Sequence, residues 1–418
     1  NKPWTFNLIL GFDMTFGTGH KLVESADLDV DPRALKREVR RLVTPKSVSE
    51  YRAKIASKSD LPEGVILDPA AGSGGQLLAY SKYLNRPCAG VELSPQRADF
   101  CAYQFSEATV NSSVIAICGD GTDAHGVMSI VESRTGQTSI CMLHVDPARP
   151  MDTQNHSVSE MQPPLKVLLE AWSKYIHVGP NGPAMALDLS PRLAPQQMSE
   201  IEHIVSGVFP STAMTWEWLS RGGGRVDRLC LQTGPLANVG SVSRAVRLWN
   251  NGSFSTLIDN GNELDSFDMG WSDYKLCTGD LVALIDPVVP KSGLRGVFEK
   301  CAGYAPGELV WIGKSERRPL ALLQDGVQSE SEVRPFVVAQ GVVVGRFPSK
   351  LDLMSIDSLA ALAMKNGVGT IQIRCSSEPR LHTRITDRLR QIMGQVHGST
   401  GFLIDDGGSQ DLVLCREL

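Results

Sequence analysis

The chain has 418 residues, of which 42% are hydrophobic and 21% are charged, and its formal net charge is −5 at pH 7. This composition is typical of a globular protein and argues against extensive disorder. The negative net charge argues against binding of nucleic acid by the whole surface, although one local basic face would still be compatible with it. At roughly 150 residues per domain, the length predicts two or three domains.

Targeting and cysteine patterns indicate a cytoplasmic protein. No apolar run reaches about 18 residues, so no membrane span is expected, and no secretory signal peptide is visible. The nine cysteines form no Cys-x-x-Cys pair, and the eight histidines show no metal-ligand spacing. We therefore expect buried thiols and no metal site.

The most basic stretch of the chain lies near its N-terminus. Residues 31–57 are predicted to form one or two amphipathic helices, because Leu35, Val39 and Leu42 recur at helical spacing. Pro45 is expected to separate the two helices. The basic residues between positions 33 and 41 could face RNA, but a solvated helix face is the simpler interpretation.

Short apolar runs then alternate with longer helical patterns, which predicts a parallel sheet with crossover helices. Two later segments, residues 212–220 and 227–234, flank the turn RGGGRV without room for a helix, so the sheet is expected to end in an antiparallel hairpin. The five earlier runs are VILD (65–68), CAGVEL (88–93), VIAICGD (114–120), SICMLHVD (139–146) and AMALDL (184–189).

The rest of the chain predicts an added hairpin and a small α+β domain. Asn-Gly between two apolar strands in residues 245–258 is a strong hairpin signal. After Pro287 and Pro290, strands alternate with helices in a manner that predicts a split β-α-β, ferredoxin-like unit. The expected domains are an N-terminal helical segment (1–60), a Rossmann-like α/β domain (61–237), a hairpin extension (238–284) and the C-terminal unit (285–418).

The strongest functional signal is VILDPAAGSGGQLLAYSKYL, residues 65–84, in which an apolar strand ends in a turn of small residues and a helix follows. A side chain at either of the first two glycines would block a ligand or demand a strained dihedral angle. The order DxAxGxGG differs from the dinucleotide motif GxGxxG, and no GK[ST] follows, which disfavours both phosphate-binding alternatives. A purely structural turn remains the other interpretation. The residues singled out are Asp68, Pro69, Ala70, Gly72 and Gly74.

Acidic residues follow the next two predicted strands. Glu92 closes the run CAGVEL, which places its carboxylate at the carboxyl edge of the sheet, where an acid can accept hydrogen bonds from both hydroxyls of a ribose. Asp120 follows VIAIC and could receive an adenine amino group. It is equally suited to be a turn residue, since GDGTD is rich in turn formers.

The fourth strand ends in HVDPARP, where Asp146 and Pro147 would face an incoming substrate. The acid could orient a nucleophile, Pro147 would stiffen the turn, and Arg149 could hold a phosphate. A structural pair between Asp146 and Arg149 is the alternative. His144 could act as a base but is more simply a packed histidine, and Cys118 and Cys141 fall within predicted strands as core residues.

The series DPAAGSGG, GVELSP, GDGTD and HVDPAR resembles the class I S-adenosylmethionine-dependent methyltransferases. More narrowly, the chain is similar to a bacterial group of these enzymes with a C-terminal THUMP-like, ferredoxin-like domain. The narrower features are an LDPAR-type turn in place of DPP, an LSP turn within LDLSP (187–191), Glu217 with Trp218, and Asp286 with Pro287.

The resemblance implies S-adenosyl-L-methionine as cofactor. Asp68, Gly72 and Gly74 would line its methionine side, together with Pro69 and Ala70 of the same turn. The resemblance further places Glu92 at the ribose, Asp120 at the adenine, and the turn of Asp146, Pro147 and Arg149 at the reaction mouth.

The leading hypothesis is therefore methyl transfer to a base or ribose, with RNA as the expected substrate and the C-terminal domain positioning it. The first alternative is a protein that keeps the fold, has lost turnover, and binds RNA or protein. A methyltransferase that acts on small molecules or on proteins is the second. The oligomeric state is not fixed by the sequence.

Overall fold

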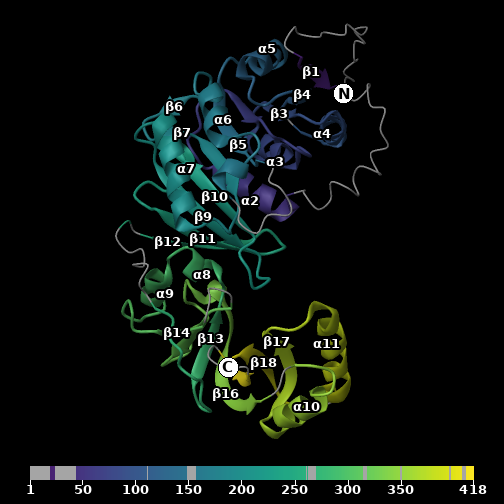
Figure 1. Ribbon diagram of the computed structural model, residues 1–418, viewed down its shortest axis with the longest axis vertical. Coiled ribbons are helices and arrows are strands. Elements are labelled where there is room, and N and C mark those ends of the chain that lie inside the picture. The colour runs from purple at the N-terminus through teal and green to yellow at the C-terminus, as the bar shows by residue number, and fades with distance from the viewer. Residues whose placement is uncertain are drawn as a thin grey trace, which may run out of the picture. The chain divides into compact units, whose positions relative to one another are not determined.

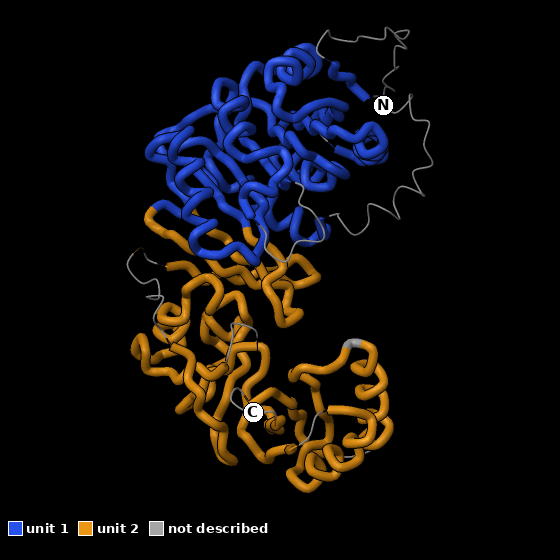
Figure 2. The backbone as a smooth tube through the Cα atoms, viewed as in Figure 1, with its two compact units in different colours: residues 1–214, 230–239 blue, residues 215–229, 240–418 orange. Residues whose placement is uncertain are grey.

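The computed structural model describes residues 19–23, 44–110, 112–147, 157–259, 261, 270–313, 318–348, 351–394, 397–406 and 411–418. The chain is divided into two compact units (Figures 1 and 2). Unit 1 comprises residues 1–214 and 230–239, and unit 2 comprises residues 215–229 and 240–418. The basic stretch 33–41 lies outside the described residues. In the part of the chain that is described, no helix is both long enough and apolar enough to cross a membrane.

The parallel sheet expected for the first half is confirmed in unit 1. Its parallel strands lie in the order β4-β3-β2-β5-β8. An edge strand that the sequence did not predict, β1 (Lys21–Val23), pairs antiparallel with β4. The bounds of the parallel strands are β2 Val65–Asp68, β3 Cys88–Glu92, β4 Val114–Cys118, β5 Ile140–Val145 and β8 Met185–Leu189.

Helices follow each strand of this sheet, as the parallel topology requires. The second of the two predicted N-terminal helices is confirmed as α2 (Lys46–Ala56), which begins directly after Pro45 and packs on α3. The others are α3 Gly75–Leu84, α4 Pro95–Glu107, α5 Ala124–Thr135, α6 Leu165–Trp172 and α7 Pro195–Val208. Short 3-10 turns η2 (Val158–Glu160) and η3 (Gly234–Leu236) and the small pair β6 (Val178–Gly179) and β7 (Gly182–Pro183) complete unit 1.

Two hairpins follow the parallel strands. β9 (Met214–Ser220) and β10 (Arg228–Thr233) are neighbours in the sheet, and residues 221–227 between them are too few for a crossover, so this hairpin is antiparallel as predicted. β11 (Ser243–Leu248) and β12 (Phe254–Ile258) pair antiparallel, which confirms the Asn-Gly hairpin. Because β11 also pairs in parallel with β9, the complete ten-stranded order is β1-β4-β3-β2-β5-β8-β10-β9-β11-β12.

A second, seven-stranded sheet lies in unit 2, in the order β14-β15-β13-β16-β19-β18-β17. Its strands are β13 Leu281–Ile285, β14 Val310–Ile312, β15 Leu320–Leu323, β16 Val337–Phe347, β17 Val368–Ile373, β18 Ser399–Asp405 and β19 Leu412–Glu417. The helices of this part are α8 Val288–Lys291, α9 Arg295–Cys301, α10 Ile356–Lys365 and α11 Pro379–Met393, with the 3-10 turn η4 at Arg334–Phe336.

The ferredoxin-like topology expected for residues 285–418 is not confirmed. A ferredoxin-like unit has the element order β-α-β-β-α-β, whereas the chain here runs β16-α10-β17-α11-β18-β19. Helix α10 follows β16 and helix α11 follows β17, so that β17 and β18 are parallel neighbours. Apolar residues of both helices, including Leu359 and Ile385, pack with β17 and β18 in one core.

Candidate functional site

The topology of unit 1 defines where a ligand would bind. The chain first passes outward from β2 to β3 and β4, and then returns to the other side of β2 to form β5 and β8. In open parallel sheets, ligands bind outside the carboxyl ends of the strands, at the point where the strand order reverses. Asp68, Glu92, Asp120 and Asp146 all stand at or just after the carboxyl ends of β2, β3, β4 and β5.

The loop between β2 and α3 has the sharp backbone that its glycines require. Gly72 has a φ of +53° and Gly74 a φ of +73°, both in the left-handed region where a side chain is strained. The two glycines differ in their surroundings. A Cβ at Gly74 would lie 2.5 Å from the Phe105 ring and 2.6 Å from the sulfur of Cys101, whereas a Cβ at Gly72 would meet nothing within 4 Å among the described residues. Gly74 thus serves helix packing, and Gly72 borders open space.

Glu92 is turned toward this loop and holds its backbone. Its Oε2 accepts a hydrogen bond from the N–H of Gly72 at 3.1 Å, and its Oε1 accepts one from the N–H of Ser94 at 2.9 Å. The N–H of Ala71 also donates to the carbonyl oxygen of Val91 at 2.9 Å. The glycine bend and the end of β3 are therefore joined by a carboxylate that is only partly buried.

Asp68 is the most electrostatically constrained group at this edge. Its side chain is buried, and its Oδ1 accepts a hydrogen bond from the N–H of Ala70 at 3.0 Å. Burial raises the pKa of the Asp68 carboxyl well above its usual value, and the nearby carboxylates of Asp146, Asp188 and Glu92 raise it further. Asp68, Asp146 and Glu92 therefore lie close together at this edge, which favours a ligand that carries positive charge there, whereas Asp188 already has Arg52 as its partner.

The loop after β4 is packed tightly against the glycine bend. A Cβ at Gly121 would lie 2.0 Å from the carbonyl oxygen of Pro69, so this contact requires glycine. Pro69 itself is buried. Asp120 is exposed, and its Oδ1 accepts hydrogen bonds from the N–H and the hydroxyl of Thr122, each at 2.8 Å, which is the turn role considered above. Among the described residues, no hydrogen bond reaches its Oδ2.

His20, which no sequence pattern singled out, positions the loop that carries Asp120. This buried residue directly precedes the edge strand β1 and lies over Gly119, where a Cβ would come within 2.1 Å of the imidazole ring. Its Nε2 is 3.1 Å from the backbone oxygen of Asp120, and its Nδ1 is 3.5 Å from Oδ2 of Asp123. The only signal that could have found it is the short strand Lys21–Val23, too short to be recognised by alternation.

The turn after β5 is described only in part. Asp146 is exposed and Pro147 is buried, whereas Arg149 lies outside the described residues, so its expected role remains a prediction. Asp146 is near enough to Asp68 to raise the pKa of that carboxyl, and near enough to His144 to act on its imidazole. The exposed Asp146 and the buried Asp68 therefore belong to the same acidic cluster.

A buried ion pair lies beneath this acidic edge. Arg52 of α2 donates from Nη1 to Oδ2 of Asp188 in β8 at 2.5 Å, with both side chains almost completely buried. Arg52 acts electrostatically on Tyr80 and on His144, which places all four groups in one buried polar cluster. Sequence reasoning did not predict the pairing of Arg52 with Asp188, because their positions are 136 residues apart.

His144 is a packed residue and a poor base. It is 1% exposed, its Nδ1 lies 3.3 Å from the hydroxyl of Tyr80, and the two rings meet edge to face. Burial lowers the pKa of His144 to about 3, and the positive charge of Arg52 lowers it as well. The imidazole is therefore neutral near pH 7. Cys141 is buried as predicted, with a pKa raised to about 11, while Cys118 is only partly buried.

Leu93 is a further residue that sequence reasoning did not single out. It follows Glu92 directly, and 73% of it is exposed, which is unusual for a large apolar side chain in the described part of unit 1. The Leu93 side chain provides apolar surface next to the Glu92 carboxylate, which is bonded to the glycine bend. This combination suits a flat, partly apolar ligand ring.

No protein-family model matches this chain, and no curated protein matches it. Among solved structures, a protein of Porphyromonas gingivalis, named as a proposed methyltransferase, matches with a TM-score of 0.56 at 15% identity, over 91% of this chain and 82% of its own. A Listeria monocytogenes protein, named as a proposed class I S-adenosylmethionine-dependent methyltransferase, gives a TM-score of 0.32 at 10% identity, over 52% and 71% of the two chains. A Streptococcus mutans methyltransferase candidate in complex with SAH gives 0.30 at 8% identity, over 46% and 99%. The first match shows a shared fold, and the other two are too distant to support an argument.

Proposed function

We propose that this protein is a methyltransferase that binds S-adenosyl-L-methionine at the carboxyl edge of its parallel sheet. One observation carries the proposal: the N–H of Gly72 is bonded to Glu92 while the space beside the α-carbon of Gly72 is open. A glycine bend held by a ribose-binding acid is the arrangement that the sequence resemblance implies. The fold shared with the Porphyromonas gingivalis protein supports it.

The residues at this edge fit the parts of the cofactor. Each carboxylate oxygen of Glu92 accepts one backbone N–H, and a carboxylate oxygen can accept about two hydrogen bonds, so capacity remains for two ribose hydroxyls. Leu93 offers apolar surface to an adenine ring. Oδ2 of Asp120 is suited to its amino group, since Oδ1 already holds the turn. The acidic cluster around Asp68 complements a sulfonium and an ammonium group.

The remaining chemistry requires mainly orientation. When bound, S-adenosyl-L-methionine supplies a methyl group on a cationic sulfur, which is intrinsically a good electrophile. The chain must then align an acceptor with that methyl group and exclude water. Asp146, exposed at the end of β5, is suited to accept a hydrogen bond from the acceptor, and Pro147 restricts the turn. His144 is poorly suited to act as the general base, because it is buried and burial lowers its pKa to about 3.

We further propose that the acceptor is RNA, methylated in the cytoplasm, with Arg149 holding a phosphate at the mouth of the site. This part rests on the sequence resemblance to the bacterial group with a THUMP-like C-terminal domain, in which residues 285–418 would position the substrate. The acidic net charge is compatible with it only if the basic residues are gathered locally.

Calorimetric titration tests the cofactor first. We expect S-adenosyl-L-methionine and its demethylated product both to bind wild-type protein. Glu92→Gln should weaken both by about tenfold or more, because a charge-assisted hydrogen bond is replaced by a neutral one. Glu107→Gln, an exposed acid at the end of α4, is the matched control and should bind normally. Absence of a binding signal at millimolar ligand would remove the methyltransferase proposal.

Transfer of a labelled methyl group tests the acceptor. Label in the RNA fraction, reduced in Asp146→Ala, is expected. Label in protein or metabolite fractions would replace RNA by another acceptor. If the protein binds cofactor, transfers no label and is unaffected by Asp146→Ala in every assay, a binding protein without turnover is the correct description.

A further inference from the structure

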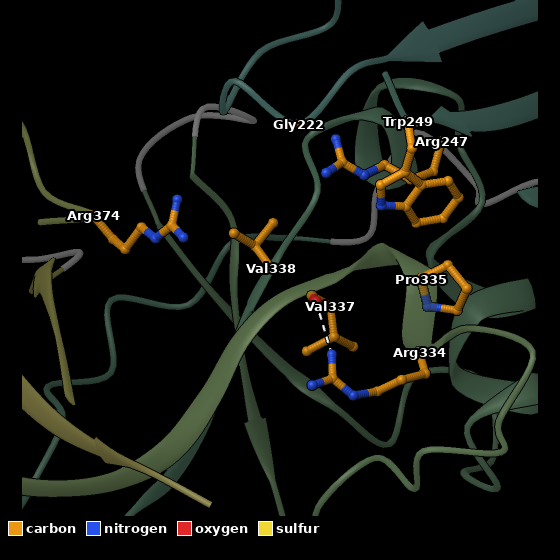
Figure 3. Close-up of a pocket in the computed structure, with 8 residues that line it drawn as sticks. All are labelled: Gly222, Arg247, Trp249, Arg334, Pro335, Val337, Val338 and Arg374. Atoms are coloured by element: carbon orange, nitrogen blue, oxygen red, sulfur yellow. Dashed lines mark hydrogen bonds between the residues drawn. The ribbon is translucent and has the colours of Figure 1, made fainter. Parts of the chain in front are cut away.

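A cavity of about 310 Å³ lies within unit 2, and none of the candidate cofactor-binding or catalytic residues lines it (Figure 3). Its lining combines three arginines with one tryptophan, and no acidic side chain is among the lining residues that the structure describes. Segments far apart in the chain build it: the β9–β10 turn, the end of β11, η4 with the start of β16, and the residue after β17. The lining residues are Gly222, Arg247, Trp249, Arg334, Pro335, Val337, Val338 and Arg374.

Arg247 is held in place by a buried network. Its Nη1 lies 3.4 Å from Oδ2 of Asp286, which also accepts a hydrogen bond from the Ser220 hydroxyl at 2.8 Å. The N–H of Gly222 donates to the same hydroxyl oxygen at 3.1 Å. A Cβ at Gly222 would lie 2.0 Å from the guanidinium nitrogens of Arg247, so this position must be glycine for the arginine to lie there. The guanidinium is thus fixed by its surroundings.

Two further guanidinium groups complete the lining. Arg334 donates from Nη1 to the carbonyl oxygen of Val337 at 2.9 Å. Arg374 donates from Nη2 to Gln372 at 2.7 Å, and Figure 3 shows it reaching in from the side opposite Trp249. Within the described residues, Nε of Arg374 is buried and donates no hydrogen bond, whereas Nη1 of Arg247 is engaged by the ion pair with Asp286.

Arg374 and Arg247 are close enough to interact electrostatically. Burial lowers the pKa of the Arg374 guanidinium, the carboxylate of Glu417 opposes this by raising it, and the positive charge of Arg247 lowers it. A phosphate, whether the monoester of a mononucleotide or the singly charged diester of an RNA chain, would reduce the repulsion between Arg374 and Arg247 and accept hydrogen bonds from their guanidinium groups. Planar guanidinium forks bind phosphate in a bidentate manner.

Trp249 adds a stacking surface beside the arginines. The Arg247 guanidinium lies 5.5 Å from the centre of its ring, and the ring is only partly buried. Bases stack on aromatic side chains next to basic grooves in single-strand binding sites. A volume of about 310 Å³ is at the lower limit for ligand pockets, which suits one nucleotide unit and excludes a duplex.

We propose that this cavity binds one nucleotide, its phosphate on Arg247, Arg334 and Arg374 and its base against Trp249. The nucleotide can come from a single-stranded RNA chain or from a free mononucleotide. The proposal that the nucleotide belongs to an RNA chain rests on the proposed function, whereas the proposal that the cavity binds a nucleotide does not.

The test uses the full chain and three probes: a short fluorescent single-stranded oligoribonucleotide, adenosine 5′-monophosphate, and inorganic phosphate. Arg247→Gln and Arg374→Gln should each weaken nucleotide binding by about tenfold or more. For the oligonucleotide, each should also flatten the slope of log K against log salt by about 0.7. Val338→Phe fills the cavity without changing charge and should weaken binding equally. Arg384→Gln, on the exposed face of α11, is the charge-matched control and should bind normally.

The outcomes separate the alternatives. Tighter binding of the oligonucleotide than of the mononucleotide assigns the RNA source, and the reverse assigns a free nucleotide. If Arg384→Gln weakens binding as much as Arg374→Gln, or if Val338→Phe has no effect, binding is diffuse electrostatics and the proposal is overturned. It is also overturned if inorganic phosphate binds as tightly as the mononucleotide, because Trp249 then contributes nothing.

Two controls keep this result independent of the fold and of the methyltransferase proposal. Circular dichroism melting verifies that each variant is folded, and Arg374→Gln is retained if Arg247→Gln unfolds because Asp286 loses its ion pair. Cofactor titrations on the same variants should match wild type. A nucleotide site with no cofactor binding would refute the proposed function alone, whereas normal cofactor binding with unaltered nucleotide affinity would refute the cavity alone.

Discussion

The carboxyl group of Asp68 combines burial with acidic neighbours, and this has consequences for both stability and binding. Since its pKa is raised above the usual 3.8, the folded state holds this proton to a higher pH than the unfolded chain does. The folded state therefore binds more protons between the two pKa values, and stability is lost as pH rises through the raised pKa. A bound cation lowers the pKa of Asp68 again, because it favours the ionised carboxylate.

Asp68→Asn tests this account. Asparagine can still accept the hydrogen bond from Ala70, so the turn is kept while the charge is removed. We expect a higher melting temperature than wild type at pH 7, and about tenfold to hundredfold weaker binding of S-adenosyl-L-methionine. Wild-type affinity should rise with pH through the raised pKa, and binding should release a proton, detected by calorimetry in buffers of different ionisation enthalpy.

The asparagine variant should show neither the proton release nor that pH dependence. If it binds the cofactor as tightly as wild type and is no more stable, the acidic cluster does not serve a cationic ligand.

Residues at strand ends could be identified from the sequence because an apolar run, its end and the acid that follows it are all local. Asp68, Glu92, Asp120 and Asp146 were found in this way, and the structure places them along one sheet edge. What each carboxylate contacts could not be predicted. The Arg52–Asp188 pair depends on how α2 packs, which no local pattern encodes.

At the scale of elements, the β2–α3 connection divides its work between two glycines. Both have positive φ, but only Gly74 is packed against another helix, through Phe105 and Cys101 of α4. A left-handed backbone at a non-glycine residue costs about 1 to 2 kcal/mol, and overpacking adds about 1 to 3 kcal/mol. The same change at the two positions therefore has different consequences.

Gly74→Ala is expected to lower the free energy of unfolding by about 2 to 5 kcal/mol, since it combines strain with a clash. Gly72→Ala should cost only the strain, about 1 to 2 kcal/mol, yet weaken the cofactor more, because its methyl group enters the open space. Urea denaturation and calorimetric titration of both variants measure the two effects. If the two variants lose cofactor affinity in the same proportion to the stability that each one loses, neither glycine borders the ligand.

Elements were predicted well where hydrophobic periodicity is strong and less well where topology decides. The helix and strand patterns of the C-terminal half correspond to α10, α11 and β16 to β19. Their arrangement differs from the ferredoxin-like one because pairing partners are set by long-range packing, and β15 (Leu320–Leu323) was too short to stand out. Strand number and order were therefore the parts that the sequence left open.

At the scale of the whole molecule, each unit has one local cluster of like charge. Unit 1 gathers carboxylates at the end of its parallel sheet, and unit 2 gathers arginines around its cavity. The net charge of −5 does not reveal these clusters, since it sums over the whole chain. Each unit is thereby suited to a ligand of opposite charge, a cation in unit 1 and a phosphate in unit 2.

Hydrogen exchange measured by mass spectrometry can read both sites in one protein. A ligand at about 100 times its Kd stabilises the bound state by about 2.7 kcal/mol, so amides that exchange only after the ligand leaves should slow by up to about 100-fold. S-adenosyl-L-methionine should protect peptides covering 65–84, 88–94 and 114–123, and a mononucleotide those covering 243–249, 334–338 and 368–375. If the cofactor protects amides evenly over both units, the two units open together in one exchange reaction. If the cofactor gives no protection in residues 65–84, it binds elsewhere. Because each ligand also serves as the other's control, the local pattern of protection distinguishes a specific site from general stabilisation.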